Sequence, residues 1–222
     1  MCPDFGAVIF DLDGLVLDTE TTYFAAWRQA AGKMGYQLSE PFCKSLSGLS
    51  YGAVTQKIID LCGPDFDLER FNRISGDCWR TLVQTQGIEV KPGFHQLLEL
   101  IRRQTLPYCL ATNSRLTNAL ACLDLAGLTN IFEVIVARDH VEYGKPAPDI
   151  FWVASERLGI DISRCLALED SAAGVIGATE AGAFSIFIPS SLPADDEATF
   201  RCDRQCPDLN EVARWLQGNL AY

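Results

Sequence analysis

Five short apolar segments rich in β-forming residues alternate with helical patterns along most of the chain. Continuous apolarity over about four to eight residues is typical of strands that are buried on both faces of a parallel sheet. The expected strands are Ala7–Phe10, Pro107–Ala111, Phe132–Ala137, Arg164–Leu168 and Phe184–Ile188. The expected helices between them are Gly93–Gln104, Leu116–Ala126, Asp149–Leu158 and Ala172–Ala181. This alternation predicts right-handed βαβ units and an α/β fold, a doubly wound parallel sheet with a Rossmann-like core.

The segment that follows the first strand breaks this alternation. Residues 19–86 contain no strand-like run, and their apolar side chains show helical spacing from Tyr23 to Ala31. Lys91-Pro92-Gly93 then marks the return to alternation. We therefore expect a helical cap domain, residues 19–86, inserted into a core of residues 1–18 and 87–222. Such an insertion leaves the sheet at the C-terminal end of a strand, where open α/β sheets bind ligands.

The last part of the chain and its overall charge set further bounds. Pro189–Tyr222 is expected to be a polar loop followed by a short helix near Leu209–Leu216. The formal net charge is −11, without a run of Lys or Arg, which disfavours nucleic acid as a partner but permits a small phosphorylated metabolite. No apolar stretch approaches the ~20 residues of a membrane span, and the N-terminus does not resemble a signal peptide. Nine scattered cysteines without a C-x-x-C pair favour reduced thiols in a cytoplasmic protein.

Asp11 and Asp13 stand two residues apart at the end of the first apolar strand, and Gly14 follows them. Two such carboxylates are costly unless a cation or a proton separates their charges. Mg²⁺ prefers oxygen ligands and leaves room for phosphate oxygens. One carboxylate could then attack phosphorus while the other transfers protons. A solvated strand-to-loop turn explains the same three residues about equally well.

Three further strand ends carry polar residues of related chemistry. Thr112-Asn113-Ser114 could hold phosphate oxygens, could cap the next helix, or could do both. Lys145, in a proline-flanked loop, could neutralise phosphate charge, although a lone Lys is more often a surface residue. Glu169-Asp170 offers hard oxygen ligands, and with Ser171 is also a plausible helix cap. Because parallel strands bring their C-terminal ends to one edge, the combination indicates a single site.

These four segments resemble the four motifs of the haloacid dehalogenase-like hydrolase superfamily. The first motif is similar to the segment from Asp11 to Thr19. The segments Lys145–Phe151 and Leu168–Gly174 resemble the branch that contains β-phosphoglucomutases and sugar phosphatases with a small helical cap.

The resemblance implies a role for each motif residue. It implies Asp11 as nucleophile, Asp13 as general acid and then base, and Thr112 and Lys145 as the residues of the second and third motifs. It also implies a Mg²⁺ site built from the Asp11 carboxylate, the Asp13 backbone carbonyl and Asp170, with Glu169 nearby. The implied activity is hydrolysis of a small phosphorylated metabolite, a sugar phosphate, through a phosphoaspartate.

Phosphatase and mutase share this first step and differ in their cap residues. β-Phosphoglucomutases carry a His after the first motif and a Lys-Gly-x-x-Arg pattern in the cap. This chain has Tyr23 in place of the His, and Ser47 and Tyr51 in place of the Lys and the Arg, around the retained Gly48. Tyrosine has no positive charge with which to bind a distal phosphate.

We therefore predict a phosphatase, with a mutase as the alternative and a non-catalytic phosphometabolite-binding sensor as a second alternative. The predicted substrate-contacting residues are Asn113, Tyr23, Ser47, Gly48 and Tyr51. Packing within the cap explains Tyr23 at least as well.

Overall fold

The structure is a computed structural model that describes residues 4–47, 49, 51–190 and 194–219, with only the backbone of Tyr51. The chain divides into two compact units. One consists of Met1–Leu17 together with Glu89–Tyr222, and the other of Asp18–Ile88. The expected boundaries lay after residues 18 and 86.

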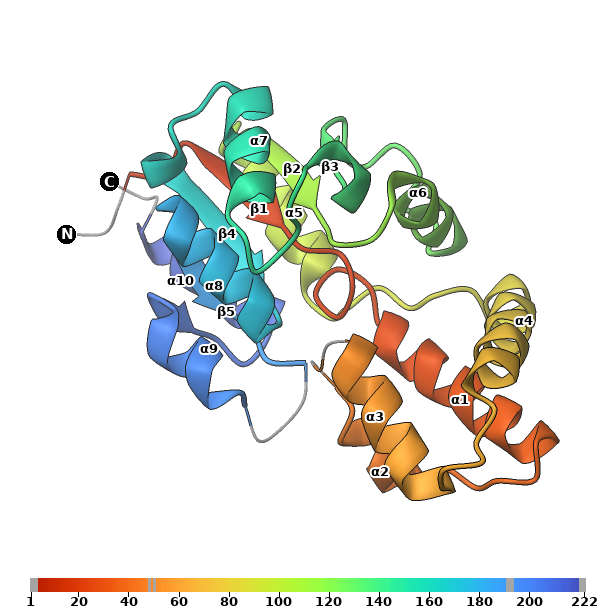
Figure 1. Cartoon of the computed structure of the whole chain (residues 1–222). Helices are drawn as coiled ribbons and strands as arrows, with labels where there is room; N and C mark the ends of the chain where they lie inside the picture. Colours follow the sequence, from red (N-terminus) through yellow and green to blue (C-terminus); the bar gives the residue numbers. More distant parts are fainter. Residues whose placement is uncertain (1–3, 48, 50, 191–193, 220–222) are drawn as a thin grey trace. The chain divides into compact units, whose positions relative to one another are not determined.

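The first unit is built around a parallel six-stranded sheet in the order β3-β2-β1-β4-β5-β6 (Figure 1). Its strands are β1 (Ala7–Phe10), β2 (Tyr108–Ala111), β3 (Ile135–Val136), β4 (Cys165–Glu169), β5 (Phe184–Phe187) and β6 (Arg204–Gln205). The strand order reverses at β1, which pairs with both β2 and β4. An α/β fold with a doubly wound parallel sheet was predicted, and the structure confirms it.

Helices cover both faces of this sheet (Figure 1). The helices of this unit are α5 (Phe94–Arg103), α6 (Leu116–Leu125), α7 (Asp149–Leu158), α8 (Ala172–Ala181), α9 (Asp196–Arg201) and α10 (Leu209–Asn219). Two short 3₁₀ helices are η1 (Arg138–His140) and η2 (Ile162–Arg164). Helices α7 and α8 lie in front of the sheet in Figure 1, while α5 and α10 lie behind it.

Alternate residues of β1 supply the cores on the two faces, because side chains along a strand point to opposite sides. Ala7 and Ile9 belong to a buried cluster that includes Phe151 of α7 and Ala178 of α8. On the other face, the Phe10 ring packs against aromatic rings. Its centroid is 5.8 Å from that of Phe94, 5.8 Å from that of Phe132 and 6.5 Å from that of Tyr108.

Three elements differ from those expected. β3 is a two-residue strand, shorter than the expected run, and the Phe132 ring at the start of that run packs against Phe10. In the segment expected to be a polar loop, the chain forms α9 and β6. β6 is polar and was not recognisable from its residues. It is held at the sheet edge by backbone pairing, and the Ser185 N–H donates to Asp203 at 2.8 Å.

The second unit is helical, with α1 (Thr19–Lys33), α2 (Glu40–Lys44), α3 (Tyr51–Cys62) and α4 (Leu68–Gln86). Asp18 caps α1 by accepting a hydrogen bond from the Thr21 N–H at 3.3 Å. The unit has its own core, in which Ala30 and Ala31 of α1 join Ile58 of α3 and Phe71 near the start of α4.

Candidate active site

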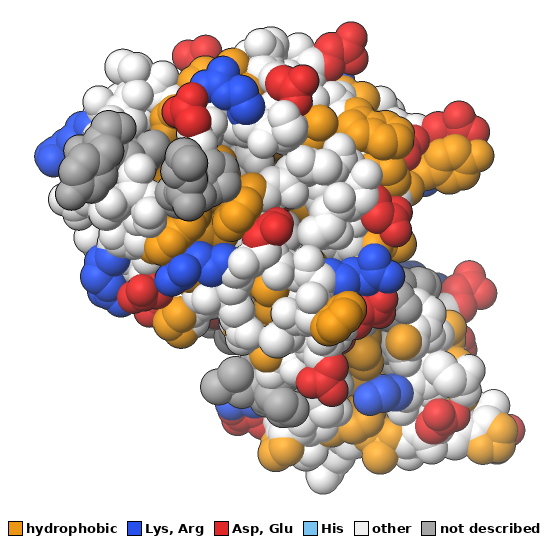
Figure 2. Space-filling model, turned by 90° about the vertical axis from the view of Figure 1, so that its left-hand side faces the viewer, with side chains coloured by type: hydrophobic (Ala, Val, Ile, Leu, Met, Phe, Trp, Pro, Cys, Tyr) orange, Lys and Arg blue, Asp and Glu red, His pale blue; other side chains and the backbone are white. Residues whose placement is uncertain are grey.

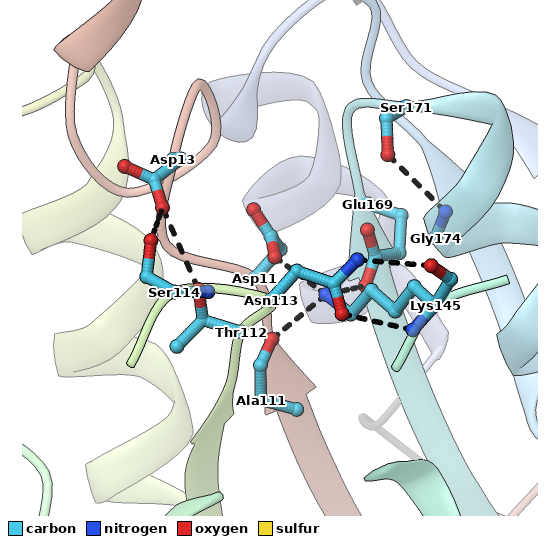
Figure 3. Close-up of polar contacts among 10 residues, drawn as sticks. All are labelled: Asp11, Asp13, Ala111, Thr112, Asn113, Ser114, Lys145, Glu169, Ser171 and Gly174. Carbon is cyan, nitrogen blue, oxygen red and sulfur yellow. Dashed lines mark hydrogen bonds and ion pairs between the residues drawn. The ribbon is translucent and has the colours of Figure 1, made fainter. Parts of the chain in front are cut away.

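Four segments that are far apart in the sequence meet at the C-terminal edge of the sheet (Figure 3). Asp11 follows β1, Thr112 follows β2, and Glu169 ends β4. Lys145 lies in the loop between η1 and α7. A parallel sheet places all of its strand ends at one edge, and the order reverses at β1, so the site forms at the switch point of the sheet.

The Lys145 ammonium stands at the centre of this arrangement. Its Nζ lies 2.5 Å from Asp11 Oδ1, 2.7 Å from Glu169 Oε1 and 2.8 Å from the carbonyl oxygen of Ala111. All three charged side chains are buried. Lys145 therefore joins three strand ends through one buried cation.

Burial and charge act in opposite directions on these groups. Burial raises the pKa of the Asp11 carboxyl, although the Lys145 charge lowers it. Burial likewise raises the pKa of Glu169 to about 8, against the lowering by Lys145. Burial would lower the pKa of Lys145, but Asp11 and Glu169 together raise it above its ordinary value, so the ammonium stays charged. The single Lys145 ammonium therefore does not fully compensate for the burial of the Asp11 and Glu169 carboxylates.

Asp11, Glu169 and Asp170 bring one carboxylate oxygen each to within 4.8 Å of one another, and all three residues are buried. Three carboxylates beside one ammonium leave an excess of negative charge that a divalent cation would balance. Carboxylate oxygens are the donors that hard cations such as Mg²⁺ prefer. The residues present therefore fit a hard divalent metal ion.

Two glycines provide the space for these carboxylates. A β-carbon on Gly14, whose φ is +84°, would lie 1.9 Å from Asp170 Oδ2. A β-carbon on Gly174, in the first turn of α8, would lie 1.7 Å from Glu169 Oε2. The absence of a side chain at Gly14 thus lets the Asp170 carboxylate approach the loop after β1.

Asp13 lies on the loop after β1, beside two hydroxyl groups of the β2 loop (Figure 3). The Ser114 hydroxyl donates to Asp13 Oδ2 at 2.7 Å, and Thr112 Oγ1 is 3.5 Å from the same oxygen. Thr112 Oγ1 also accepts a hydrogen bond from the Ser114 N–H at 3.0 Å. Asp13 is half-buried, so its carboxylate is more accessible than that of Asp11.

The side-chain amide of Asn113 makes two hydrogen bonds to the backbone of Lys145. Its Nδ2 donates to the Lys145 carbonyl at 2.9 Å, and its Oδ1 accepts from the Lys145 N–H at 2.8 Å. Asn113 had been predicted to contact substrate, and its amide here fastens the β2 loop to the Lys145 loop.

The helix-capping alternatives for the motif residues have two different outcomes. Ser171 caps α8 by accepting from the Gly174 N–H at 3.2 Å, as the sequence allowed. The residues from Thr112 to Ser114 do not cap α6, because its N-cap position is Arg115, whose side chain makes no capping hydrogen bond. The first amide of the helix, Leu116 N–H, donates to Asp139 at 2.9 Å.

The predicted cap residues lie in the helical unit. Tyr23 stacks on Trp79, with ring centroids 5.4 Å apart, and on Trp27. The Ser47 hydroxyl donates to the Glu20 carboxylate, with its oxygen 2.6 Å from each carboxylate oxygen. Gly48 and the side chain of Tyr51 lie outside what the structure describes. The substrate roles of these four residues stay predictions.

The contacts of Ser114, Gly174 and Glu20 were not expected from sequence. Ser114 and Gly174 lie within motif segments, and this placement was the only indication in the sequence that they could belong to the site. Glu20 directly follows the first motif, but its contact with Ser47 could not be predicted, because the two residues are distant in sequence.

The switch point of this parallel α/β sheet holds a buried Asp, a buried Lys and a paired Glu-Asp, which are groups suited to phosphoryl transfer with a bound metal ion. The family model described as haloacid dehalogenase-like hydrolase matches residues 8–188, and the chain belongs to this family. The predicted resemblance is thereby confirmed.

Relatives of known description agree with this assignment. The fructose-1-phosphate phosphatase YqaB of Escherichia coli K12 is 32% identical over 180 residues, which cover 80% of this chain and 93% of that protein. The β-phosphoglucomutase of Bacillus subtilis 168 is 28% identical over 193 residues, covering 84% of each. A HAD hydrolase of family IA, variant 3, from Entamoeba histolytica has a crystal structure with a TM-score of 0.77 and 27% identity, covering 97% of this chain and 99% of that one.

Family membership and the phosphatase relative together support a phosphoric monoester hydrolase, as the sequence predicted. Among the residues that the structure describes, no helix is both long and apolar enough to cross a membrane.

Proposed function

We propose that this protein is a Mg²⁺-dependent phosphatase that hydrolyses a small phosphorylated metabolite of the sugar phosphate class through a phosphoaspartate on Asp11. The observation that carries the proposal is the buried Asp11 carboxylate, held by Lys145 at 2.5 Å beside the Glu169 and Asp170 carboxylates.

The reaction consists of two phosphoryl transfers. In the first, an Asp11 carboxylate oxygen bonds to phosphorus while the bond from phosphorus to the alcohol oxygen breaks. Asp13 gives its proton to that oxygen, and the alcohol leaves. In the second, a water oxygen bonds to phosphorus, Asp13 takes a proton from that water, and the Asp11–phosphorus bond breaks. Inorganic phosphate leaves, and both carboxyl groups return to their initial states.

The surrounding residues would stabilise the transferring group. Phosphoryl transfer depends on positioning and on neutralisation of negative charge. Lys145 supplies positive charge and aims Asp11, while the Thr112 hydroxyl stands at the same sheet edge. Asp11, Glu169, Asp170 and the Asp13 backbone carbonyl would hold Mg²⁺, which would supply further positive charge to the phosphoryl oxygens.

Two sources support a sugar phosphate as substrate. The relatives include a fructose-1-phosphate phosphatase and a phosphatase of phosphorylated carbohydrates from Thermotoga maritima, 31% identical over 182 residues. The chain's own acidity disfavours large polyanions.

A phosphosugar mutase is the second candidate, because one relative is a β-phosphoglucomutase. The mutase must bind a second phosphate in its cap. Tyr23, Ser47 and Tyr51 replace the His, Lys and Arg expected there, so no positive charge stands at these three positions. This absence favours the phosphatase.

The test is a panel of phosphorylated metabolites with Mg²⁺, scored for released inorganic phosphate. β-Glucose 1-phosphate is included, and glucose 6-phosphate is measured separately. Release from sugar phosphates that Asp11→Asn abolishes supports the proposal, while isomerisation with little release would establish a mutase. Binding of sugar phosphates without turnover would establish a sensor, and unchanged turnover in folded Asp11→Asn would refute the phosphoaspartate.

A further inference from the structure

We infer that Ser114 is a positioning residue for proton transfer: its hydroxyl holds Oδ2 of Asp13 and leaves Oδ1 as the oxygen that exchanges the proton with the leaving group and with water. This inference rests on the proposed function, since it assigns a partner to the general acid of that reaction.

The first observation is the geometry of the two hydroxyls beside Asp13. Ser114 Oγ is 2.7 Å from Asp13 Oδ2, a normal distance for a hydroxyl donating to a carboxylate. Thr112 Oγ1 is 3.5 Å from the same oxygen, at the outer limit for a hydrogen bond. Ser114 is therefore the main hydroxyl partner of Asp13, and the Thr112 hydroxyl proton stays available for a phosphoryl oxygen.

The second observation is that the backbone of Ser114 is fixed on both sides. Its N–H donates to Thr112 Oγ1 at 3.0 Å, and its carbonyl accepts from the Arg138 N–H at 3.0 Å. Thr112 in turn extends the pairing of β2, because its N–H donates to the Val136 carbonyl at 2.9 Å. The hydroxyl of Ser114 is thus presented from the sheet edge and does not depend on a mobile side chain alone.

The third observation is the difference between the two aspartates. Asp11 is buried and paired with Lys145, so its carboxylate is held in one position for nucleophilic attack. Asp13 lies half-exposed on a loop, and the structure gives its side chain no cationic partner among the described residues. A short side chain on a loop needs an anchor to hold one oxygen in line with the leaving group, because a misplacement of about 1 Å can cost about 10²-fold in rate.

A hydrogen bond to Oδ2 determines which oxygen carries the proton. While Oδ2 accepts from Ser114, the acid form of Asp13 carries its proton on Oδ1. That proton passes to the alcohol oxygen as the phosphorus–oxygen bond breaks. The same Oδ1 then accepts the proton of the attacking water, so each turnover returns Asp13 to its starting form without movement of Ser114.

The test uses two substrates of similar size that differ in their need for acid catalysis. The p-nitrophenolate of p-nitrophenyl phosphate leaves without a proton, whereas the alkoxide of benzyl phosphate requires one. The ratio kcat/KM reports the steps up to formation of the phosphoaspartate, so it isolates the proton donation from the later hydrolysis.

Ser114→Ala should lower kcat/KM for benzyl phosphate by about tenfold or more relative to its effect on p-nitrophenyl phosphate, as loss of one charge-assisted hydrogen bond of about 1.5–3 kcal/mol implies. Ser114→Thr, which keeps the hydroxyl, should restore the ratio. Ser114→Cys, which keeps the size and weakens the donor, should act like Ser114→Ala and serves if the alanine variant does not fold. The control is Thr117→Ala, which removes an exposed hydroxyl from the neighbouring helix α6.

Equal losses for the two substrates would overturn the inference and make Ser114 a phosphate-binding residue. Unchanged values for both would also overturn it. If the unaltered protein hydrolyses neither substrate nor any metabolite of the panel, the proposed function fails, and that result is distinct from an effect of Ser114.

Discussion

Gly174 and Glu169 stand in such close contact that a β-carbon on Gly174 would lie 1.7 Å from Glu169 Oε2. The clash involves a buried carboxylate that is already fixed by Lys145 at 2.7 Å. The position of Glu169 in the site therefore requires a glycine at residue 174, in the first turn of α8.

Gly174→Ala should reduce turnover by roughly 5- to 150-fold, because Glu169 must leave its position beside Lys145 and the energetic cost of such a shift is of order 1–3 kcal/mol. The measurement is kcat/KM with p-nitrophenyl phosphate, together with the thermal midpoint. Gly218→Ala is the matched control, since a β-carbon there, in helix α10, meets nothing within 4 Å. That control should keep full activity and stay within about 0.5 kcal/mol of the parent in stability, because Gly218 is an exposed residue near the end of its helix. Equal activity of the two variants would contradict the role given to Gly174.

Mg²⁺ should stabilise the folded chain, because Asp11, Glu169 and Asp170 place three carboxylates beside one ammonium. A ligand at 100 times its Kd adds about 2.7 kcal/mol, which for a chain of this size raises Tm by about 5–10 °C. Thermal unfolding with Mg²⁺ and with a chelator measures this shift. Asp170→Asn should reduce the shift, whereas Asp65→Asn, at an exposed carboxylate of the helical unit, should leave it unchanged. A full shift in Asp170→Asn would remove Asp170 from the metal site.

Asn113→Ala should impair catalysis through Lys145, because it removes both hydrogen bonds between this amide and the Lys145 backbone. Two hydrogen bonds of about 0.5–1.5 kcal/mol each correspond to a loss of roughly 5- to 150-fold in kcat/KM. In a Lys145→Met background the same substitution should have little further effect on kcat/KM, which a double-mutant cycle measures. Asn118→Ala, at an exposed residue of α6, is the control. The same loss in both backgrounds would show that Asn113 acts on substrate directly.

Phe10→Ala should destabilise the fold without involving the chemistry. Its buried ring packs with Phe94 and Phe132 at 5.8 Å, so its removal should cost about 3–5 kcal/mol of unfolding free energy. Urea denaturation measures the change. Phe200 is 89% exposed, and Phe200→Ala should stay within about 0.5 kcal/mol of the parent. A small effect at Phe10 would mean that this aromatic cluster contributes little to the sheet.

Much of the core could be predicted from the chain itself. The apolar run Ala7–Phe10, the Asp11-Leu12-Asp13-Gly14 turn after it and the later strand–helix alternation are local patterns, and each carries its own physical signal. Strand and helix periodicities are patterns among residues a few positions apart, so they can be read directly from the sequence. The parallel sheet then requires the polar residues at the strand ends to share one edge. That requirement is why Asp11, Lys145 and Glu169 could be grouped from the sequence.

Tertiary structure decided the contacts whose partners are distant and whose residues are unremarkable locally. The strand β6 is polar and exists because Asp203 and β5 hold it. The pairing of Ser114 with Asp13 joins loops that are 101 residues apart. The space for Glu169 depends on the packing of the first turn of α8, which contains Gly174, against the end of β4. Periodicity records which face a residue occupies, but hydrogen bonds and steric fit depend on distances of a few tenths of an ångström, which only the packed chain sets.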